Sequence, residues 1–374
     1  MSRKKTGVIG ATGYTGSEIV RILTHHPEVE VSLITSESHA GKKFSDIHPF
    51  FQGIVDDTLF TADRVDETDL DLVFLALPHG ISMEYVKRFA GRDFRIVDFS
   101  GDFRLNSPEV YREWYQKEHS YAAGFDGAVY GLPELFADEI RNARLVANPG
   151  CFPTGAILSL APLVAGNAIE KNGIIIDSKT GVTGAGIKPS AVNMFSNVND
   201  NFKAYGLMKH RHTIEIQSIL EKLGGELSPI QFTPHLLPVD RGILTTVYAR
   251  PADDFARNSE KREPHTLSAD DQSFDAKNSG IEKTYANRFR EIFHDFYRDK
   301  PFVRMCKQPP AIKDVRASNY CNIYVDFDER TGNVMVISAI DNLVKGAAGL
   351  AVQNMNVLLG FEETAGLGHV PVNP

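Results

Sequence analysis

Cysteine is scarce in this sequence of 374 residues, which contains only Cys151, Cys306 and Cys321. Three cysteines are too few for the disulfide framework of a secreted protein, and an odd number would leave one cysteine unpaired. The basic start of the chain leads into a glycine-rich strand and turn, and not into the apolar run of a signal peptide. We therefore expect a reducing compartment and predict a cytoplasmic location.

Long apolar runs and an excess of positive charge are also missing. No stretch of about 18 uninterrupted apolar residues occurs, so we expect a soluble protein without a membrane partner. The formal net charge of −8 argues against nucleic acid as the main partner, because no basic stripe is available to neutralise phosphates. A chain of this length with 42% hydrophobic residues predicts a large core and two domains.

A glycine-rich turn near the N-terminus predicts a dinucleotide site. A short β-branched strand leads into three glycines with the spacing Gly-x-x-Gly-x-x-Gly, and an amphipathic helix follows. Such glycines permit a tight turn and a close approach of the backbone to a pyrophosphate at the helix N-terminus, although a plain strand-turn-helix is the alternative. The predicted cofactor contacts in this turn are Gly10, Thr12, Gly13, Tyr14, Thr15 and Gly16.

Continuous apolar strands at 30–35, 70–77 and 94–99 alternate with helices, which predicts a doubly wound parallel sheet of the Rossmann type. Ligands lie beyond the carboxyl ends of such strands, so the loops that begin at Pro78 and Ser100 should face the cofactor. The strand at 30–35 ends at Thr35 and Ser36, where an NAD enzyme places a carboxylate. These hydroxyls, with two lysines nearby, favour NADP, while the carboxylate of Glu37 leaves NAD as the alternative.

The central motif is the turn at 147–156, which has two prolines and two glycines around Cys151. It predicts a sharp turn followed by a helix, with the cysteine at the helix N-terminus. There the macrodipole and the unpaired amides should lower the thiol pKa and bind a developing oxyanion, which predicts a nucleophile. The alternative is a buried cysteine that acts as a small hydrophobe.

Two later segments carry further candidates. Residues 178–186 follow an apolar strand and combine three glycines with alternating hydroxyls, which suits an anion such as phosphate, or forms only a flexible turn. His210 and His212 precede a helix and are candidate acid-base partners of the thiol. We expect an extended lead-in in which they point to opposite sides, so that only one reaches the thiol, with a preference for His212.

The remaining sequence predicts a strand pair within 232–249 and a polar surface excursion at 251–283. A helix should cover 285–297, and alternating patterns at 320–326 and 333–339 predict half-buried antiparallel strands. The chain ends in a helix at 340–359 with small residues at its start, which can press its backbone against a cofactor.

Six motifs together resemble the N-acetyl-gamma-glutamyl-phosphate reductase family of arginine biosynthesis, and they span nearly the whole chain. They lie at residues 10–16, 100–105, 129–134, 148–154, 209–213 and 341–348. The resemblance implies an NADP-binding Rossmann domain of residues 1–149 with 341–374, to which we assign Gly184 and Asn342 as further cofactor contacts. It also implies an α+β catalytic and oligomerisation domain of glyceraldehyde-phosphate dehydrogenase type at 150–340, in a homo-oligomer, either a dimer or a tetramer.

The resemblance implies that Cys151 attacks an acyl phosphate and that either His210 or His212 serves as the acid-base group, without a metal. The product would be N-acetylglutamate 5-semialdehyde, formed by hydride transfer from NADPH to a thioester. The excursion at 251–283 departs from the usual length of the family. Two alternatives are aspartate-semialdehyde dehydrogenase, which shares fold, thiol and cofactor, and a non-catalytic NADP-binding protein.

Overall fold

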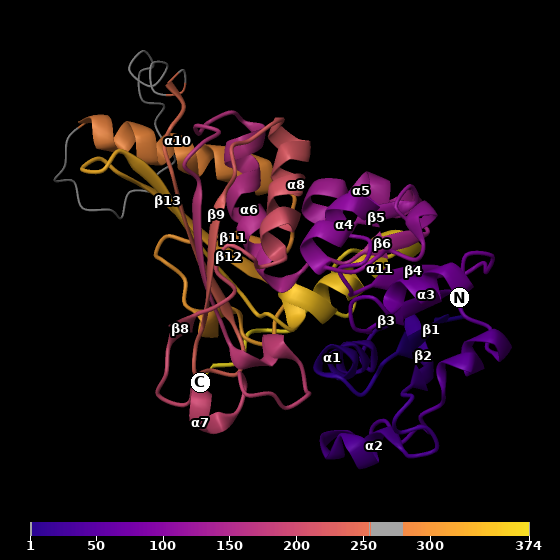
Figure 1. The fold of residues 1–374 in the computed structure, drawn as a ribbon. Coiled ribbons are helices and arrows are strands. Elements are labelled where there is room, and N and C mark those ends of the chain that lie inside the picture. Colours follow the sequence, from indigo (N-terminus) through magenta and orange to yellow (C-terminus); the bar gives the residue numbers. More distant parts are fainter. Residues whose placement is uncertain (1, 254, 256–279, 374) are drawn as a thin grey trace.

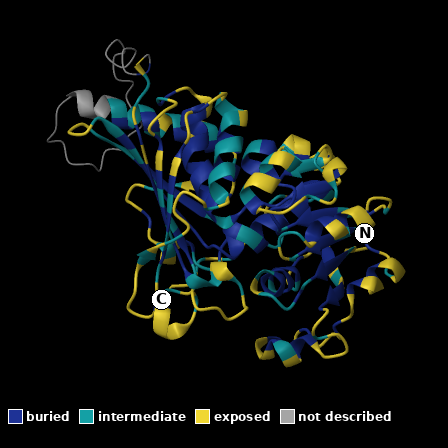
Figure 2. Ribbon diagram, viewed as in Figure 1, coloured by how far each residue is buried: buried dark blue, intermediate teal, exposed yellow. Residues whose placement is uncertain are grey.

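The computed structural model describes residues 2–253, 255 and 280–373, so the predicted excursion at 251–283 lies almost wholly outside the described residues. The chain forms two lobes, each built around one β-sheet, and helix α11 (Gly349–Leu359) runs between them (Figure 1). The junction of the lobes is buried, whereas the loops around the short helix α7 (Phe195–Val198) are exposed (Figure 2).

The first sheet confirms the predicted doubly wound fold. Its strands are all parallel and lie in the order β2-β1-β3-β4-β6-β5. They are β1 (Lys4–Ile9), β2 (Val29–Thr35), β3 (Leu72–Leu75), β4 (Arg95–Asp98), β5 (Ala128–Tyr130) and β6 (Leu145–Ala147). Every residue of β3 is buried, as expected when helices cover both faces of a parallel sheet. The helices of this lobe are α1 (Tyr14–Leu23), α2 (Phe44–Ile47), η1 (Pro49–Phe51), η2 (Ala62–Glu67), α3 (Ser82–Arg88), α4 (Pro108–Tyr115), η3 (Ala122–Gly124) and α5 (Pro133–Asn142).

The second sheet is mixed, with the order β11-β12-β13-β10-β7-β9-β8. Its strands are β7 (Ile175–Thr180), β8 (Lys203–Ala204), β9 (Gln231–Leu236), β10 (Ile243–Ala249), β11 (Val303–Met305), β12 (Cys321–Asp328) and β13 (Asn333–Ile340). Helices α6 (Cys151–Ala165), α8 (His212–Gly224) and α10 (Gly280–Tyr297) lie along one side of this sheet in Figure 1. In β10, Thr245 and Val247 are fully buried while Tyr248 is exposed, so the sheet has one packed and one open face.

The sequence predicted the antiparallel pair β12–β13 correctly, but the expected strand pair within 232–249 is wrong. Strand β7 lies between β9 and β10, parallel to β9 and antiparallel to β10. The physical reason is that the alternation of apolar residues determines which face of a strand is buried, and does not determine which strand lies beside it.

The predicted C-terminal helix is divided. Residues Val344–Ala348 form the π-helical turn η7, in which the amide of Ala348 donates to the carbonyl of Leu343 at 2.8 Å, and α11 follows directly. Two further short helices connect strands, η4 (Val182–Ala185) and η6 (Ile312–Val315). Within the part of the chain that the structure describes, no helix has both the length and the apolar character needed to cross a membrane.

Candidate active site

Cys151 is the first residue of α6, and the N-cap position before it is occupied by Gly150. The predicted turn and helix N-terminus are therefore confirmed. The amide of Asn148 donates to the carbonyl of Asp98 at 2.8 Å, and its side chain donates to the carbonyl of Ala347 at 3.2 Å. The turn that presents the thiol is therefore fixed before Cys151 by the bonds of Asn148 and after it by α6, which is buried along nearly its whole length.

His212 is the first residue of α8 and lies against this turn. A Cβ atom on Gly150 would lie only 2.4 Å from Nε2 of His212, so the close approach of imidazole and turn requires glycine at this position. Cys151 and His212 line the same cleft between the lobes.

His210 does not line that cleft, but its ring lies 4.8 Å from the ring of His212, measured between centroids. The expectation of an extended lead-in with opposed side chains is therefore wrong. Residue 211 has helical backbone angles and the amide of Thr213 donates to the carbonyl of His210 at 2.9 Å, so the chain turns and both rings pack against Phe152.

The electrostatics of the thiol also correct an expectation. Burial raises the pKa of Cys151 to about 11, and the nearby Arg104 guanidinium and the Phe152 amide lower it only in part. Burial, with the neighbouring His210 and Arg104, holds the pKa of His212 well below its ordinary value. At neutral pH the pair is therefore a neutral thiol and a neutral imidazole, because the helix N-terminus does not outweigh desolvation.

Glu215 and Arg104 form a buried ion pair behind the turn that presents Cys151, which the sequence did not predict. Oε1 of Glu215 accepts from the amide of Gly150 at 2.8 Å, and Nη1 of Arg104 lies 3.3 Å from Oε2. Nε of Arg104 donates to the carbonyl of Asn148 at 2.8 Å, so the pair holds the turn on both sides of Pro149. A glutamate between Ile214 and Ile216, in the first turn of an apolar helix, was the available signal.

The cleft itself has a volume of about 290 Å³ and brings together several segments that are distant in sequence. They include the start of α1, the turn at Cys151, the start of α8, and residues of the segments at 183–187 and 342–347. Predicted residues that line it are Gly13, Tyr14, Thr15, Gly16, Cys151, Gly184, His212 and Asn342. His79, Arg104 and Thr183 also line the cleft; they were not named singly, but they belong to the loops that the sequence predicted to face the cofactor or an anion. Gly346 and Ala347 line it as well.

The remaining predicted cofactor contacts do not line this cleft. Gly10 has φ +84°, and a Cβ on it would lie 2.5 Å from the carbonyl oxygen of Ala76, so its role is to permit the turn. Pro78 is exposed beside the cleft. Ser100 is buried, and its hydroxyl donates to Asp98 at 2.7 Å.

The other three predicted contacts lie at the carboxyl end of β2. Oγ1 of Thr12 lies 3.0 Å from Oγ of Ser36, while Thr35 is buried. The carboxylate of Glu37 accepts from the amide of Ala62 at 2.9 Å and is therefore occupied at the start of η2. Lys42 and Lys43 are exposed.

The predicted anion loop at 178–186 is only partly a loop. Strand β7 continues to Thr180, and the buried Oγ of Ser178 lies 2.8 Å from Oγ1 of Thr245 on β10. The strand alternation turns this hydroxyl toward the helices. Thr183 and Gly184 do line the cleft, and Nδ2 of Asn342 donates to Oγ1 of Thr183 at 3.0 Å.

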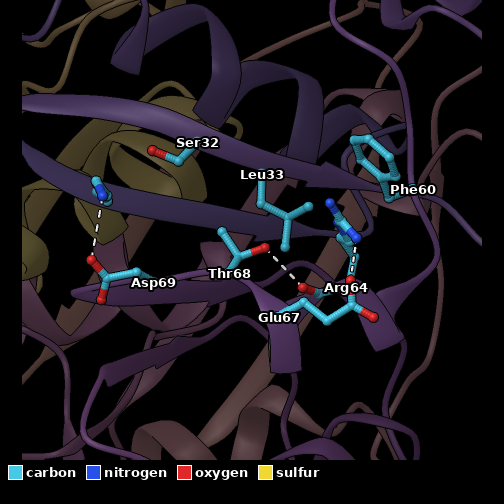
Figure 3. A pocket seen from close by; sticks show the side chains of 8 residues that line it. Ser32, Leu33, Phe60, Arg64, Glu67, Thr68 and Asp69 are labelled. Atoms are coloured by element: carbon cyan, nitrogen blue, oxygen red, sulfur yellow. Dashed lines mark hydrogen bonds and ion pairs between the residues drawn. The ribbon is translucent and has the colours of Figure 1, made fainter.

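A second cleft of about 320 Å³ lies beside β2 and η2 (Figure 3). Its charges are paired, because Lys5 lies 3.3 Å from Asp69 and Arg64 contacts Glu67. It contains no cysteine or histidine, so it is not the candidate catalytic site. Among the described residues, no group of three or more histidine, cysteine, aspartate or glutamate side chains is arranged to hold a metal ion.

Comparisons with known proteins agree with this architecture. A family model described as "Semialdehyde dehydrogenase, NAD binding domain" matches residues 5–143, and one described as "Semialdehyde dehydrogenase, dimerisation domain" matches residues 151–269 and 276–342. An N-acetyl-gamma-glutamyl-phosphate reductase from Pelotomaculum thermopropionicum is 46% identical over 369 residues, which is 97% of each chain. The enzyme of that name from Methanocaldococcus jannaschii is 44% identical, over 99% of this chain and 100% of the relative.

Among solved structures, aspartate semialdehyde dehydrogenase II from Vibrio cholerae has a TM-score of 0.66 at 16% identity, over 96% of this chain and 99% of that one. Aspartate semialdehyde dehydrogenase with NADP from Candida albicans has a TM-score of 0.62 at 17% identity, with the same coverage. At this level of identity the likeness concerns the fold alone.

Proposed function

The chain belongs to the N-acetyl-gamma-glutamyl-phosphate reductase family of semialdehyde dehydrogenases, and we propose that Cys151 and His212 carry its reaction. The reaction is the reductive dephosphorylation of N-acetyl-gamma-glutamyl phosphate to N-acetylglutamate 5-semialdehyde in arginine biosynthesis. One observation carries the assignment of the residues. The N-termini of α6 and α8 place a cysteine and a histidine in one cleft with the glycine-rich start of α1.

In the first half of the reaction, the proton of the Cys151 thiol passes to Nε2 of His212 as Sγ attacks the acyl carbon. The bond from that carbon to the phosphate oxygen then breaks, inorganic phosphate leaves with the electron pair, and a thioester remains. The amides at the N-terminus of α6 stabilise the negative charge that develops on the carbonyl oxygen. A base is needed because the resting thiol is protonated at neutral pH.

When bound, the nicotinamide cofactor supplies a hydride to the thioester carbon. The resulting thiohemiacetal oxyanion collapses, the carbon–sulfur bond breaks, and the aldehyde is released. The imidazolium of His212 returns its proton to the leaving sulfur of Cys151, which restores the neutral pair.

The residues at the start of α1 fit a dinucleotide. A Cβ on Gly16 would lie 2.4 Å from the carbonyl oxygen of Gly10, so the close turn depends on glycine, and Gly13 forms the N-cap of the helix. A pyrophosphate suits such a helix N-terminus. We propose NADP as the cofactor, because the hydroxyls of Thr12 and Ser36 lie where a 2′-phosphate would be held and Glu37 is occupied elsewhere.

We further propose that residues 1–149 with 341–374 form the cofactor domain and that 150–340 form the catalytic and oligomerisation domain of a homo-oligomer, either a dimer or a tetramer. The matched dimerisation domain and the open face of the second sheet support this division. On that face, Ile175 and Tyr248 are exposed although they are large and apolar.

Trapping the acyl-enzyme tests the proposed chemistry. The protein is incubated with N-acetylglutamate semialdehyde and NADP, first without phosphate, and its intact mass is measured. We expect an N-acetylglutamyl adduct at Cys151 that phosphate removes, and none in Cys151→Ala. The thioester would be contradicted if no adduct formed without phosphate, although the enzyme turned over when phosphate was added and Cys151→Ala retained activity.

A further inference from the structure

Two cationic side chains at one edge of the active-site cleft have no carboxylate partner among the described residues. They are Arg211, between the two histidines, and Lys117, which follows α4; both are exposed. The other arginines near the cleft are paired, because Arg104 contacts Glu215 and Arg241 contacts Glu18 at 2.9 Å. Neither side chain lines the cleft itself, but Lys117 contacts His79, which does, and Arg211 contacts the Tyr115 ring that packs against His79. Unpaired cations at this wall indicate a binding site for an anionic group.

Arg211 is held in place by an aromatic face. Its guanidinium carbon lies 4.9 Å from the centroid of the Tyr115 ring, a cation–π arrangement. The Tyr115 ring stacks on Tyr111 with an interplanar angle of 8° and is itself buried. A Cβ on Gly101 would lie 1.8 Å from the Tyr115 hydroxyl, so this ring is fixed in position under the guanidinium.

Lys117 is turned toward the same place by the backbone. Gln116 ends α4 in the left-handed conformation, with φ +53°, which is unusual for a residue other than glycine. Nζ of Lys117 donates to the carbonyl of His79 at 3.3 Å and lies over Gly80. The two cations thus come from different lobes and flank His79.

His79 connects this edge with the cleft, because it lines the cleft and its ring lies 5.3 Å from the Tyr115 ring. Its Nδ1 accepts from the amide of Gly101 at 2.6 Å, so a neutral imidazole carries its proton on Nε2 and can only donate there. Burial and the charges of Arg104, Arg211 and Lys117 lower the pKa of His79 to about 3, which indicates a positive field at this wall.

The substrate of the proposed function carries an α-carboxylate four carbon–carbon bonds from the reacting carbon, a distance of about 5 Å. Arg104 also lines the cleft, but three of its five N–H donors are bound to Asn148, Glu215 and Phe99, and its charge is paired with Glu215. We propose that Arg211 and Lys117 form the subsite that binds the α-carboxylate of the substrate. This inference rests on the proposed function and adds the groups that would recognise the far end of the substrate.

The test compares two aldehydes that differ only in this carboxylate, N-acetylglutamate semialdehyde and 4-acetamidobutanal, each with NADP and phosphate. For Arg211→Met and for Lys117→Met we expect kcat/KM on the carboxylated aldehyde to fall about 10- to 100-fold, the range for a charge-assisted hydrogen bond. On 4-acetamidobutanal the change should stay below about 5-fold. Arg211→Lys keeps the charge and should retain part of the preference.

Arg112→Met is the matched control, because Arg112 is exposed on α4 and lies 3.6 Å from Glu118. It should leave both aldehydes unchanged. If the Arg211 and Lys117 variants lost kcat/KM equally on the two aldehydes, or lost none on either, the subsite would be overturned. The proposed function would still be supported by the wild-type rate on N-acetylglutamate semialdehyde. A wild-type protein that does not oxidise N-acetylglutamate semialdehyde would overturn both.

Discussion

Nδ1 of His210 accepts a hydrogen bond from the backbone amide of His212 at 3.2 Å. This contact separates the two histidines of one motif. His212 presents its ring to the cleft and the thiol turn, whereas His210 satisfies a free amide at the start of α8 and holds the neighbouring residue. Burial and the nearby Arg211 lower the pKa of His210 to about 4, so it remains a neutral acceptor.

The two histidines should therefore respond differently to the same substitution. We expect His212→Asn to lower kcat by about 10²- to 10⁴-fold, the usual contribution of an acid-base group. His210→Asn keeps an acceptor that can reach the His212 amide and should cost less than about 10-fold, whereas His210→Leu removes the acceptor and should cost more. Steady-state kinetics of the three variants measure this, and equal losses from the two asparagine variants would contradict the separation.

The raised pKa of Cys151 predicts how the thiol reacts in the free enzyme. Only the thiolate is alkylated, and with a pKa of about 11 its fraction rises about tenfold for each pH unit from 7 to 10. The rate of inactivation by iodoacetamide should follow this slope. A rate that is already at its plateau at pH 7 would mean that a thiolate–imidazolium pair exists at rest, contrary to the neutral pair described above.

The buried pair of Glu215 and Arg104 predicts a change in stability. Glu215→Gln keeps an acceptor for the Gly150 amide but leaves the Arg104 charge unpaired, so the free energy of unfolding should fall by about 3–5 kcal/mol. Glu226→Gln, on an exposed side chain just after the same helix, should change it by less than about 0.5 kcal/mol. Urea denaturation of the two variants measures both free energies. Similar losses for both variants would show that the ion pair does not stabilise the fold.

The preference for NADP or NAD tests the proposed 2′-phosphate site at the end of β2. We expect a higher kcat/KM with NADP than with NAD, and Ser36→Glu should reverse the preference, because a carboxylate there repels a 2′-phosphate and can bind ribose hydroxyls. Glu37→Gln should matter little to this ratio, since that side chain is bound to the start of η2. A wild-type preference for NAD, or a ratio that Ser36→Glu leaves unchanged, would contradict this assignment.

Much of the fold could be predicted because its signals are local. Continuous apolar strands predicted the parallel sheet, and alternation predicted β12 and β13. The position of β7 between β9 and β10 could not be predicted, since neighbours in a sheet are chosen by long-range packing. The π-helical turn at Val344–Ala348 also depends on tertiary contact, because a Cβ on Gly346 would lie 2.9 Å from Cβ of Cys151.

The candidate site divides in a similar way. Glycines and prolines predicted where α1 and α6 begin, because the backbone conformations that these residues favour can be recognised in the sequence. The direction of the thiol pKa was predicted wrongly, because the helix N-terminus was visible in the sequence whereas the desolvation of Cys151, which raises its pKa, follows from tertiary packing. The sequence predicted that the loops carrying His79 and Arg104 face the cleft, which is confirmed, but it did not single out these two side chains, because their reach depends on the folded loops.

The substrate preference of the purified protein, followed by NADPH absorbance in the direction of oxidation, tests the proposed reaction most directly. With phosphate, NADP and no added divalent metal, N-acetylglutamate semialdehyde should be oxidised. Aspartate semialdehyde should be slower by at least about 10²-fold in kcat/KM, because its ammonium group would meet the cations Arg211 and Lys117, and none of the described residues that line the cleft carries a carboxylate. We expect that difference, and we expect a chelator to leave it unchanged. Comparable rates with the two aldehydes would contradict the proposed substrate.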